Sequence, residues 1–101
     1  KTVSESMSVL RNKLAKKLYE TGILYMKMDE FEPARMSFNQ VLDLYYDTDI
    51  IENIHYEIIK SYLKQGKDEK ARSHWINKGR DSIKKEKLVL ELTEVFSQKE
   101  I

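Results

Sequence analysis

The 101-residue sequence contains no cysteine, one proline and three glycines. The absence of cysteine excludes disulfide bonds, thiolate zinc sites and thiol catalysis, although it does not indicate a cellular compartment. Because proline and glycine are the residues that most disfavour helices, their scarcity favours an all-α fold. A chain of this length forms one domain with a modest core.

The sequence also has little net charge and no long apolar run. Eighteen basic and seventeen acidic residues leave a formal charge of +1, which provides no overall field for nucleic acid or an anionic membrane. No apolar run approaches the ~18 residues of a membrane span, and the first residues lack the apolar stretch of a signal peptide. We therefore expect no direct membrane span and no nucleic-acid partner.

Apolar residues recur at intervals of three, four and seven, which is the spacing of a helix with one buried face. This spacing predicts a helix from about residue 8 to 28, and a second that begins near Pro33 and ends near Tyr45. A third helix is expected from Ile50, because Asp49 and Glu52 have the spacing of a capping box. We expect that helix to end at Gly66, which can adopt the left-handed conformation.

A fourth helix is expected after Asp68, and the segment Asn77-Lys78-Gly79 then predicts a turn. A fifth helix is expected over residues 82–97, with the remaining residues frayed. The predicted organisation of residues 1–101 is thus one domain with hairpins at 8–45 and 50–78 and a capping helix at 82–97.

The two predicted hairpins are related by a constant shift of 37 residues. Each copy has a tyrosine, an alanine nine residues later and a large aromatic residue four residues after that. This pattern resembles the tetratricopeptide repeat, in which small residues lie where two helices approach closely and aromatic residues fill the space between hairpins. The expected packing residues are Gly22, Tyr25, Ala34, Phe38, Tyr62, Ala71 and Trp75.

The resemblance implies two tetratricopeptide-type hairpins and a C-terminal capping helix, as a fragment of a right-handed α-solenoid. In such repeats the first helix of each hairpin lines the concave side. The repeat register therefore predicts a partner-binding face, with simple packing against the third helix as the alternative role for Tyr19 and Ile23. This face comprises Lys16, Tyr19, Ile23, Met26, Tyr56, Lys60, Leu63 and Lys64.

No arrangement of residues that is typical of catalysis is found. His55 and His74 are nineteen residues apart and lack the spacing of a helical metal pair. There is no phosphate-binding glycine loop, nucleophile elbow or calcium loop. We expect no enzyme activity, no metal and no cofactor.

A more specific resemblance comes from two segments that occur together: Arg11-x-Lys13-Leu14-Ala15 and Tyr45-Tyr46-Asp47-Thr48. With Tyr25, Phe31, Ala34 and Phe38, they resemble the C-terminal tetratricopeptide region of outer-membrane assembly lipoproteins of the BamD type. The resemblance covers about residues 9–76, and Tyr46 stands where that family usually has proline. It implies a periplasmic scaffold held at the outer membrane through an anchor absent from this chain. Its implied partners are the barrel insertase or other assembly subunits.

The sequence therefore predicts a non-enzymatic protein-binding scaffold. One alternative is a generic tetratricopeptide adaptor that binds short peptides. The alternative location is the cytoplasm. A less favoured alternative is a small helical nucleic-acid-binding domain, because the lysine-rich segments also fit solvated helix faces. Apolar residues near Leu10 and Leu90 also suggest self-association.

Overall fold

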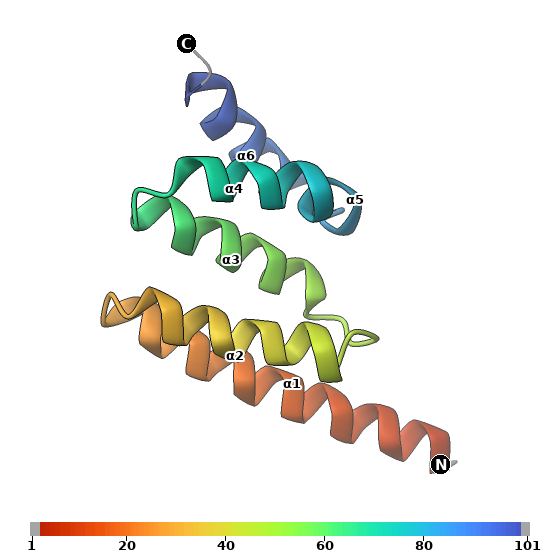
Figure 1. Cartoon of the computed structure of the whole chain (residues 1–101). Coiled ribbons are helices and arrows are strands. Elements are labelled where there is room, and N and C mark those ends of the chain that lie inside the picture. Colours follow the sequence, from red (N-terminus) through yellow and green to blue (C-terminus); the bar gives the residue numbers. More distant parts are fainter. Residues whose placement is uncertain (1–2, 100–101) are drawn as a thin grey trace.

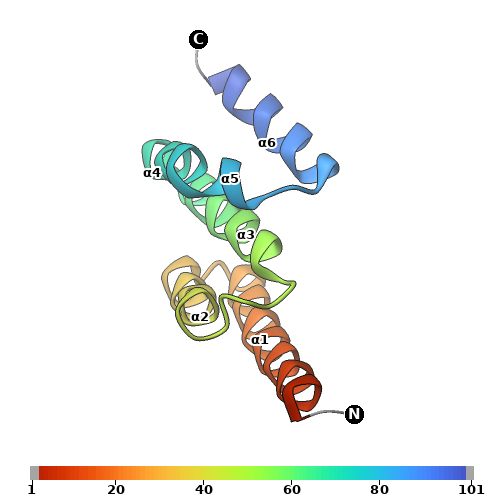
Figure 2. The ribbon, with the colours of Figure 1, turned by 90° about the vertical axis from the view of Figure 1, so that its right-hand side faces the viewer.

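The computed structural model describes residues 3–99, and every regular element in this range is helical, which confirms the predicted all-α class. The elements are α1 (Val3–Lys27), α2 (Phe31–Leu44), α3 (Ile51–Lys64), α4 (Asp68–His74), the π-helix η1 (Trp75–Gly79), α5 (Arg80–Ser82) and α6 (Glu86–Lys99). Figure 1 shows α1 beside α2 and α3 beside α4, with one pair stacked on the other. Figure 2 shows α6 set to one side of α4.

The turn within each hairpin has the same backbone geometry. Asp29 and Gly66 have positive φ values of 60° and 78°. In each case the next amide donates to a tyrosine carbonyl five residues earlier, from Glu30 to Tyr25 at 2.9 Å and from Lys67 to Tyr62 at 2.8 Å. This bond and the left-handed residue together form a Schellman motif, which ends α1 and α3. The turn expected at Gly66 is confirmed, and its partner at Asp29 lies 37 residues earlier.

The turn between the hairpins is held by an arginine from α1. Arg11 donates to Asp47 Oδ1 and to the carbonyl of Leu44, both at 2.7 Å, and its guanidinium lies 5.2 Å from the ring centre of Tyr45. The carbonyl of Leu44 is one of those left without an intrahelical partner at the C-terminus of α2. Arg11 therefore closes the end of α2 and orders the chain that leads into α3.

A buried apolar cluster joins the first hairpin to α3. Its fully buried members are Ala15, Ala34, Phe38, Val41 and Ile54. Beside it, the buried Arg35 donates to Ser61 at 2.9 Å and to Gln65 at 2.7 Å, and its guanidinium lies 4.1 Å from the ring centre of Tyr62. The charge of Arg35 is thus buried only with hydrogen-bond partners and an aromatic face.

The second hairpin differs from its expected outline in three places. The turn predicted at Asn77-Lys78-Gly79 is wrong, because the helix continues there as η1 and ends at Ser82. The last helix begins at Glu86, since Ile83 is extended (φ −87°, ψ 113°) and the chain turns after it. The predicted capping box is also absent: Ile50 occupies the cap of α3 without a side-chain bond.

Glu52, which the sequence suggested as part of that box, instead binds the segment before α6. Its Oε1 accepts the backbone amides of Lys84 and Lys85, the second at 2.9 Å. A carboxylate at the start of a helix satisfies free amides and complements the helix dipole. A second apolar cluster packs Leu92 and Phe96 of α6 against Ile59, Ala71 and Trp75. These contacts attach α6 to the second hairpin.

Candidate functional site

The residues predicted for the concave face lie on α1 and α3, and seven of the eight reach the surface. Lys16 and Lys64 are exposed, whereas the other five are half-buried. Together these seven residues form what we call the first-helix surface, which comprises Lys16, Tyr19, Ile23, Tyr56, Lys60, Leu63 and Lys64.

Met26 is the exception, because only 6% of its surface is exposed. It follows Gly22 by four residues and Ala15 by eleven, which places it on the stripe of α1 that faces the core. Its assignment to a partner-binding face was therefore wrong. Met26 packs instead in the cluster between the first hairpin and α3.

Glu91 of α6 occupies the middle of the α3 part of this surface. Its Oε1 accepts a hydrogen bond from the hydroxyl of Tyr56 at 2.8 Å and forms an ion pair with Lys60 Nζ at 3.3 Å. The bond from Tyr56, followed by the pairing with Lys60, lowers the pKa of Glu91. Burial and the neighbouring Glu91 together raise the pKa of Tyr56, which therefore stays protonated and donates.

A second carboxylate lies in the same region. Burial raises the pKa of Glu57, against the opposing effects of Lys60 and Lys64. Tyr19 also has a raised pKa, chiefly through burial and then through the charge of Glu57, while a hydrogen bond with Asn53 opposes the shift. Lys85, just before α6, donates to Asn53 Oδ1 at 2.6 Å. The first-helix surface is thus a network of tyrosine, lysine and carboxylate groups across three helices.

Sequence reasoning missed the part that α6 plays in this surface. It treated the last helix as a cap whose inner face is apolar, and the pattern of Leu88, Leu92 and Phe96 supports only that role. The sequence feature that could have indicated this contact is Glu91, an acidic residue beside that apolar face. Because Tyr56 and Lys60 already bind Glu91, the open part of the surface is its α1 side together with Lys64.

The structure also brings His55 and His74 together, which the sequence analysis did not anticipate. Nδ1 of His55 lies 2.9 Å from Nε2 of His74, and the ring centres are 5.1 Å apart. That separation is close to two ring radii added to the N–N distance, so the two nitrogens face each other as in a hydrogen bond. Nitrogens that share a metal instead point to a common third position. The available signal was that they lie on the two helices of one predicted hairpin, 11 residues before and 8 residues after Gly66.

Both histidines have lowered pKa values, which favours their neutral forms. Burial, followed by the charges of His55 and Lys78, lowers the pKa of His74 to about 4. Burial and Lys78 also lower the pKa of His55. One facing nitrogen donates and the other accepts, so the bond is lost when both facing nitrogens carry a proton.

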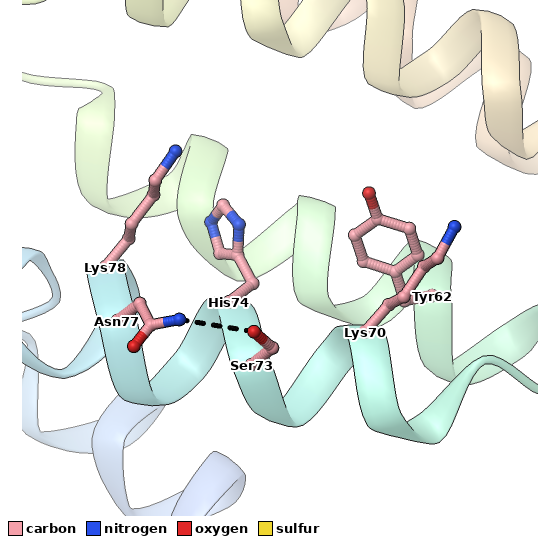
Figure 3. A pocket seen from close by; sticks show the side chains of 6 residues that line it. All are labelled: Tyr62, Lys70, Ser73, His74, Asn77 and Lys78. Atoms are coloured by element: carbon pink, nitrogen blue, oxygen red, sulfur yellow. Dashed lines mark hydrogen bonds between the residues drawn. The ribbon is translucent and has the colours of Figure 1, made fainter.

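His74 also faces a shallow hollow of about 260 Å³ between α3 and α4 (Figure 3). Each side chain around it can donate a hydrogen bond, and no carboxylate lines it. Asn77 donates to Ser73 at 3.2 Å within the rim. The lining residues are Tyr62, Lys70, Ser73, His74, Asn77 and Lys78.

Within residues 3–99, no group of three or more histidine, cysteine, aspartate or glutamate side chains is placed to hold a metal ion. Over the same residues, no helix is both long enough and apolar enough to cross a membrane. Comparison of the chain with protein-family models, curated proteins and solved structures found no match.

Proposed function

We propose that this protein is a non-enzymatic, protein-binding scaffold of tetratricopeptide type, and that its partner is the barrel insertase of outer-membrane assembly or another subunit of that machinery. Its place would be the periplasm, at the outer membrane, through an anchor outside this chain. The proposal rests on the resemblance to BamD-type lipoproteins together with the repeated hairpins described above.

The observation that carries the proposal is the contact between the two segments of the resemblance. Arg11 belongs to the first segment, and Tyr45 and Asp47 belong to the second. The three residues meet through the ion pair at 2.7 Å and the contact of the guanidinium with the tyrosine ring. Their joint occurrence in the sequence therefore corresponds to a direct contact between the two segments.

The repeat geometry supports the solenoid interpretation. Both hairpins turn through the same Schellman motif, at positions that are 37 residues apart. The first helices of the hairpins, α1 and α3, lie on one side and share the network of Tyr19, Asn53 and Tyr56. Successive hairpins that pack in this way present a continuous surface, which repeat proteins use to bind other proteins.

The open part of the first-helix surface is the proposed docking site. Lys16 and Lys64 are exposed there, and the half-buried Tyr19 and Ile23 follow Lys16 on the same face of α1, by three and seven residues. Rigid aromatic and apolar groups surrounded by lysines suit a folded partner with an acidic rim. Docking of this kind involves no turnover.

The direct test is calorimetric titration of the chain with the purified periplasmic region of an outer-membrane barrel insertase. We expect a Kd on the order of micromolar or below, and about tenfold weaker binding for Lys16→Glu and for Lys64→Glu. Lys70→Glu is the matched control, because it introduces the same charge change at an exposed position on α4. It should leave binding unchanged.

Absence of binding by the folded chain at about 100 µM insertase would contradict the proposed partner. Binding that a short unstructured peptide abolishes would favour the generic peptide adaptor instead. Equal weakening by all three substitutions would show only a general charge effect and would remove the first-helix surface from the proposal.

A further inference from the structure

A row of apolar side chains along α1 and the residue after it faces away from the rest of the molecule. Met7, Leu10, Leu14, Leu24 and Met28 are each between 40% and 58% exposed. With two exposed polar residues they recur at alternating intervals of three and four residues, which is the heptad spacing of a helix that pairs with another helix. We call these positions the α1 stripe: Met7, Leu10, Leu14, Lys17, Thr21, Leu24 and Met28.

The stripe remains in register along the whole helix. All its positions except Met28 belong to α1, and the amide of Met28 still bonds to the carbonyl of Leu24 at 3.3 Å. In Figure 1, α1 lies at the lower edge of the described structure, with α2 and α3 on one side of it. The buried face of α1, which includes Ala15 and Gly22, is therefore a different face from the stripe.

The internal repeat shows what kind of surface this is. A shift of 37 residues carries the stripe from Leu14, Lys17, Thr21, Leu24 and Met28 onto α3. The corresponding positions there are buried or half-buried against the first hairpin: Ile51, Ile54, Ile58, Ser61 and Gln65. On α3 these positions receive α2, and within residues 3–99 no helix covers the equivalent positions on α1.

The stripe also matches itself when a second α1 runs in the opposite direction. In a register where the numbers of facing residues sum to 38, apolar positions meet apolar positions and the two polar positions meet each other. The facing pairs are Leu10 with Met28, Leu14 with Leu24, and Lys17 with Thr21.

The neighbouring heptad register, in which the numbers sum to 31, places Leu14 opposite Lys17 and Leu10 opposite Thr21. That register sets polar groups against apolar ones on both sides, which is costly. A single polar layer within an apolar seam selects one register in this way. The Lys17 layer therefore selects the register that sums to 38.

We infer that the α1 stripe binds a second copy of this chain, through an antiparallel pairing of the two α1 helices around a two-fold axis that crosses the stripe between Lys17 and Thr21. This interface is distinct from the docking site of the proposed function and does not depend on it. A two-fold interface contains each residue once from each copy, so one substitution in the stripe changes two contacts of the dimer.

The test is sedimentation equilibrium on the full chain and four variants. The wild type should reach a mass of twice 12.0 kDa as its concentration rises toward about 100 µM. Leu24→Glu and Leu10→Glu should each weaken the dimer by about a hundredfold. Met36→Glu is the control, because Met36 is 69% exposed on α2 outside the stripe, and it should dimerise as the wild type does.

The fourth variant, Lys17→Leu, replaces the polar layer with an apolar one and should tighten the dimer. Circular dichroism on each variant checks the helical fold, which these exposed positions should not disturb. A wild type that stays monomeric at about 100 µM, or a Leu24→Glu variant that dimerises as well as the wild type, would overturn the inference. A monomeric wild type would leave the stripe to a helical hairpin of another kind.

Discussion

The two hairpins fill the space between their helices with residues of different size at equivalent positions. In the first, Gly22 on α1 lets the ring of Phe38 lie against the helix backbone, so close that a Cβ on Gly22 would be 2.3 Å from the ring. In the second, the position of Gly22 is taken by Ile59, and Trp75 stands in place of Phe38. There the tight contact moves to Gly79, where a Cβ would lie 3.0 Å from Trp75 and 3.1 Å from Ile59.

This difference shows that the repeat conserves a filled space and not a residue type. The first hairpin fills this space with the ring of Phe38 against Gly22. The second fills it with Ile59 and Trp75, and its glycine is Gly79, in η1. Because Gly79 lies at the end of η1, the π turn and the bulky Ile59–Trp75 pair occur together. We therefore expect a small residue at position 59, or a larger residue at position 22, to destabilise the protein.

The largest expected effect comes from emptying the second hairpin. Ile59 is fully buried against Trp75 and Ile83, so Ile59→Ala should lower the free energy of unfolding by roughly 3 kcal/mol through lost burial and a residual cavity. Urea denaturation followed by circular dichroism measures this. An unchanged free energy of unfolding would mean that Trp75 moves to fill the space left by Ile59. It would contradict the view that the second hairpin needs two large side chains there.

The converse change in the first hairpin should cost less. Gly22→Ala places a methyl group against the fully buried ring of Phe38, and the resulting strain should exceed the gain in helix propensity and leave a loss of roughly 1–2 kcal/mol. Thr21→Ala, one residue away and exposed, is the control. Combining Gly22→Ala with Phe38→Leu should recover part of the loss, and failure to do so would show that the ring is not the obstacle.

The histidine pair makes only the second hairpin sensitive to mild acid. The pKa of His74 is about 4 in the folded state and about 6.5 in the unfolded state, so the unfolded state binds more protons between these values. Stability is complete above pH 6.5 and falls as the pH is lowered toward 4. We expect a loss of roughly 1–2 kcal/mol between pH 7.5 and 5, after allowance for partial exposure.

Urea denaturation at pH 7.5 and at pH 5 measures this loss of stability, with His74→Gln as the comparison. That variant should lose most of the difference between the two pH values. Glu57, with its raised pKa, acts in the opposite sense at the lower end of the range. A wild type whose stability is the same at pH 7.5 and 5 would contradict the neutral histidine bond.

The smallest expected effect concerns the clamp of the first hairpin. Asp47→Asn removes the ion pair with Arg11 but leaves the bond from Arg11 to the carbonyl of Leu44. Since both side chains are solvated, we expect a slight loss of thermal stability that disappears at high salt. Arg11→Met, which also removes the bond to Leu44, should cost more and should retain its effect in salt. Equal effects would mean that the carbonyl contact contributes nothing.

The sequence predicts those features of this protein that are set by local spacing. The apolar periodicity indicates the four main helices, and Gly66 marks its turn because glycine is the residue best suited to positive φ. Ala34 and Ala71 are fully buried, as expected for residues at close helix approaches. Asp29 has the same left-handed conformation as Gly66, but aspartate is also common in ordinary turns, so its conformation could not be predicted.

The features that were missed depend on contacts between distant segments. Glu52 has the spacing of a local cap, yet its carboxylate binds the amides before α6, 32 and 33 residues away. Glu91 of α6 binds Tyr56 and Lys60, and Met26 is buried by an element that periodicity alone does not place. Periodicity identifies the face of a helix but not the neighbour that covers it.

The π turn has a further consequence for how the repeat itself is aligned. The second helix of the first hairpin has Tyr45 as its C-cap, whose amide donates to the carbonyl of Val41. The corresponding C-cap in the second hairpin is Ile83, whose amide donates to the carbonyl of Gly79. These two ends are 38 residues apart, whereas the residues before η1 are matched at 37. The second hairpin therefore carries a one-residue insertion that the π turn absorbs, so the two copies superimpose along their whole length only when their alignment opens a gap at η1.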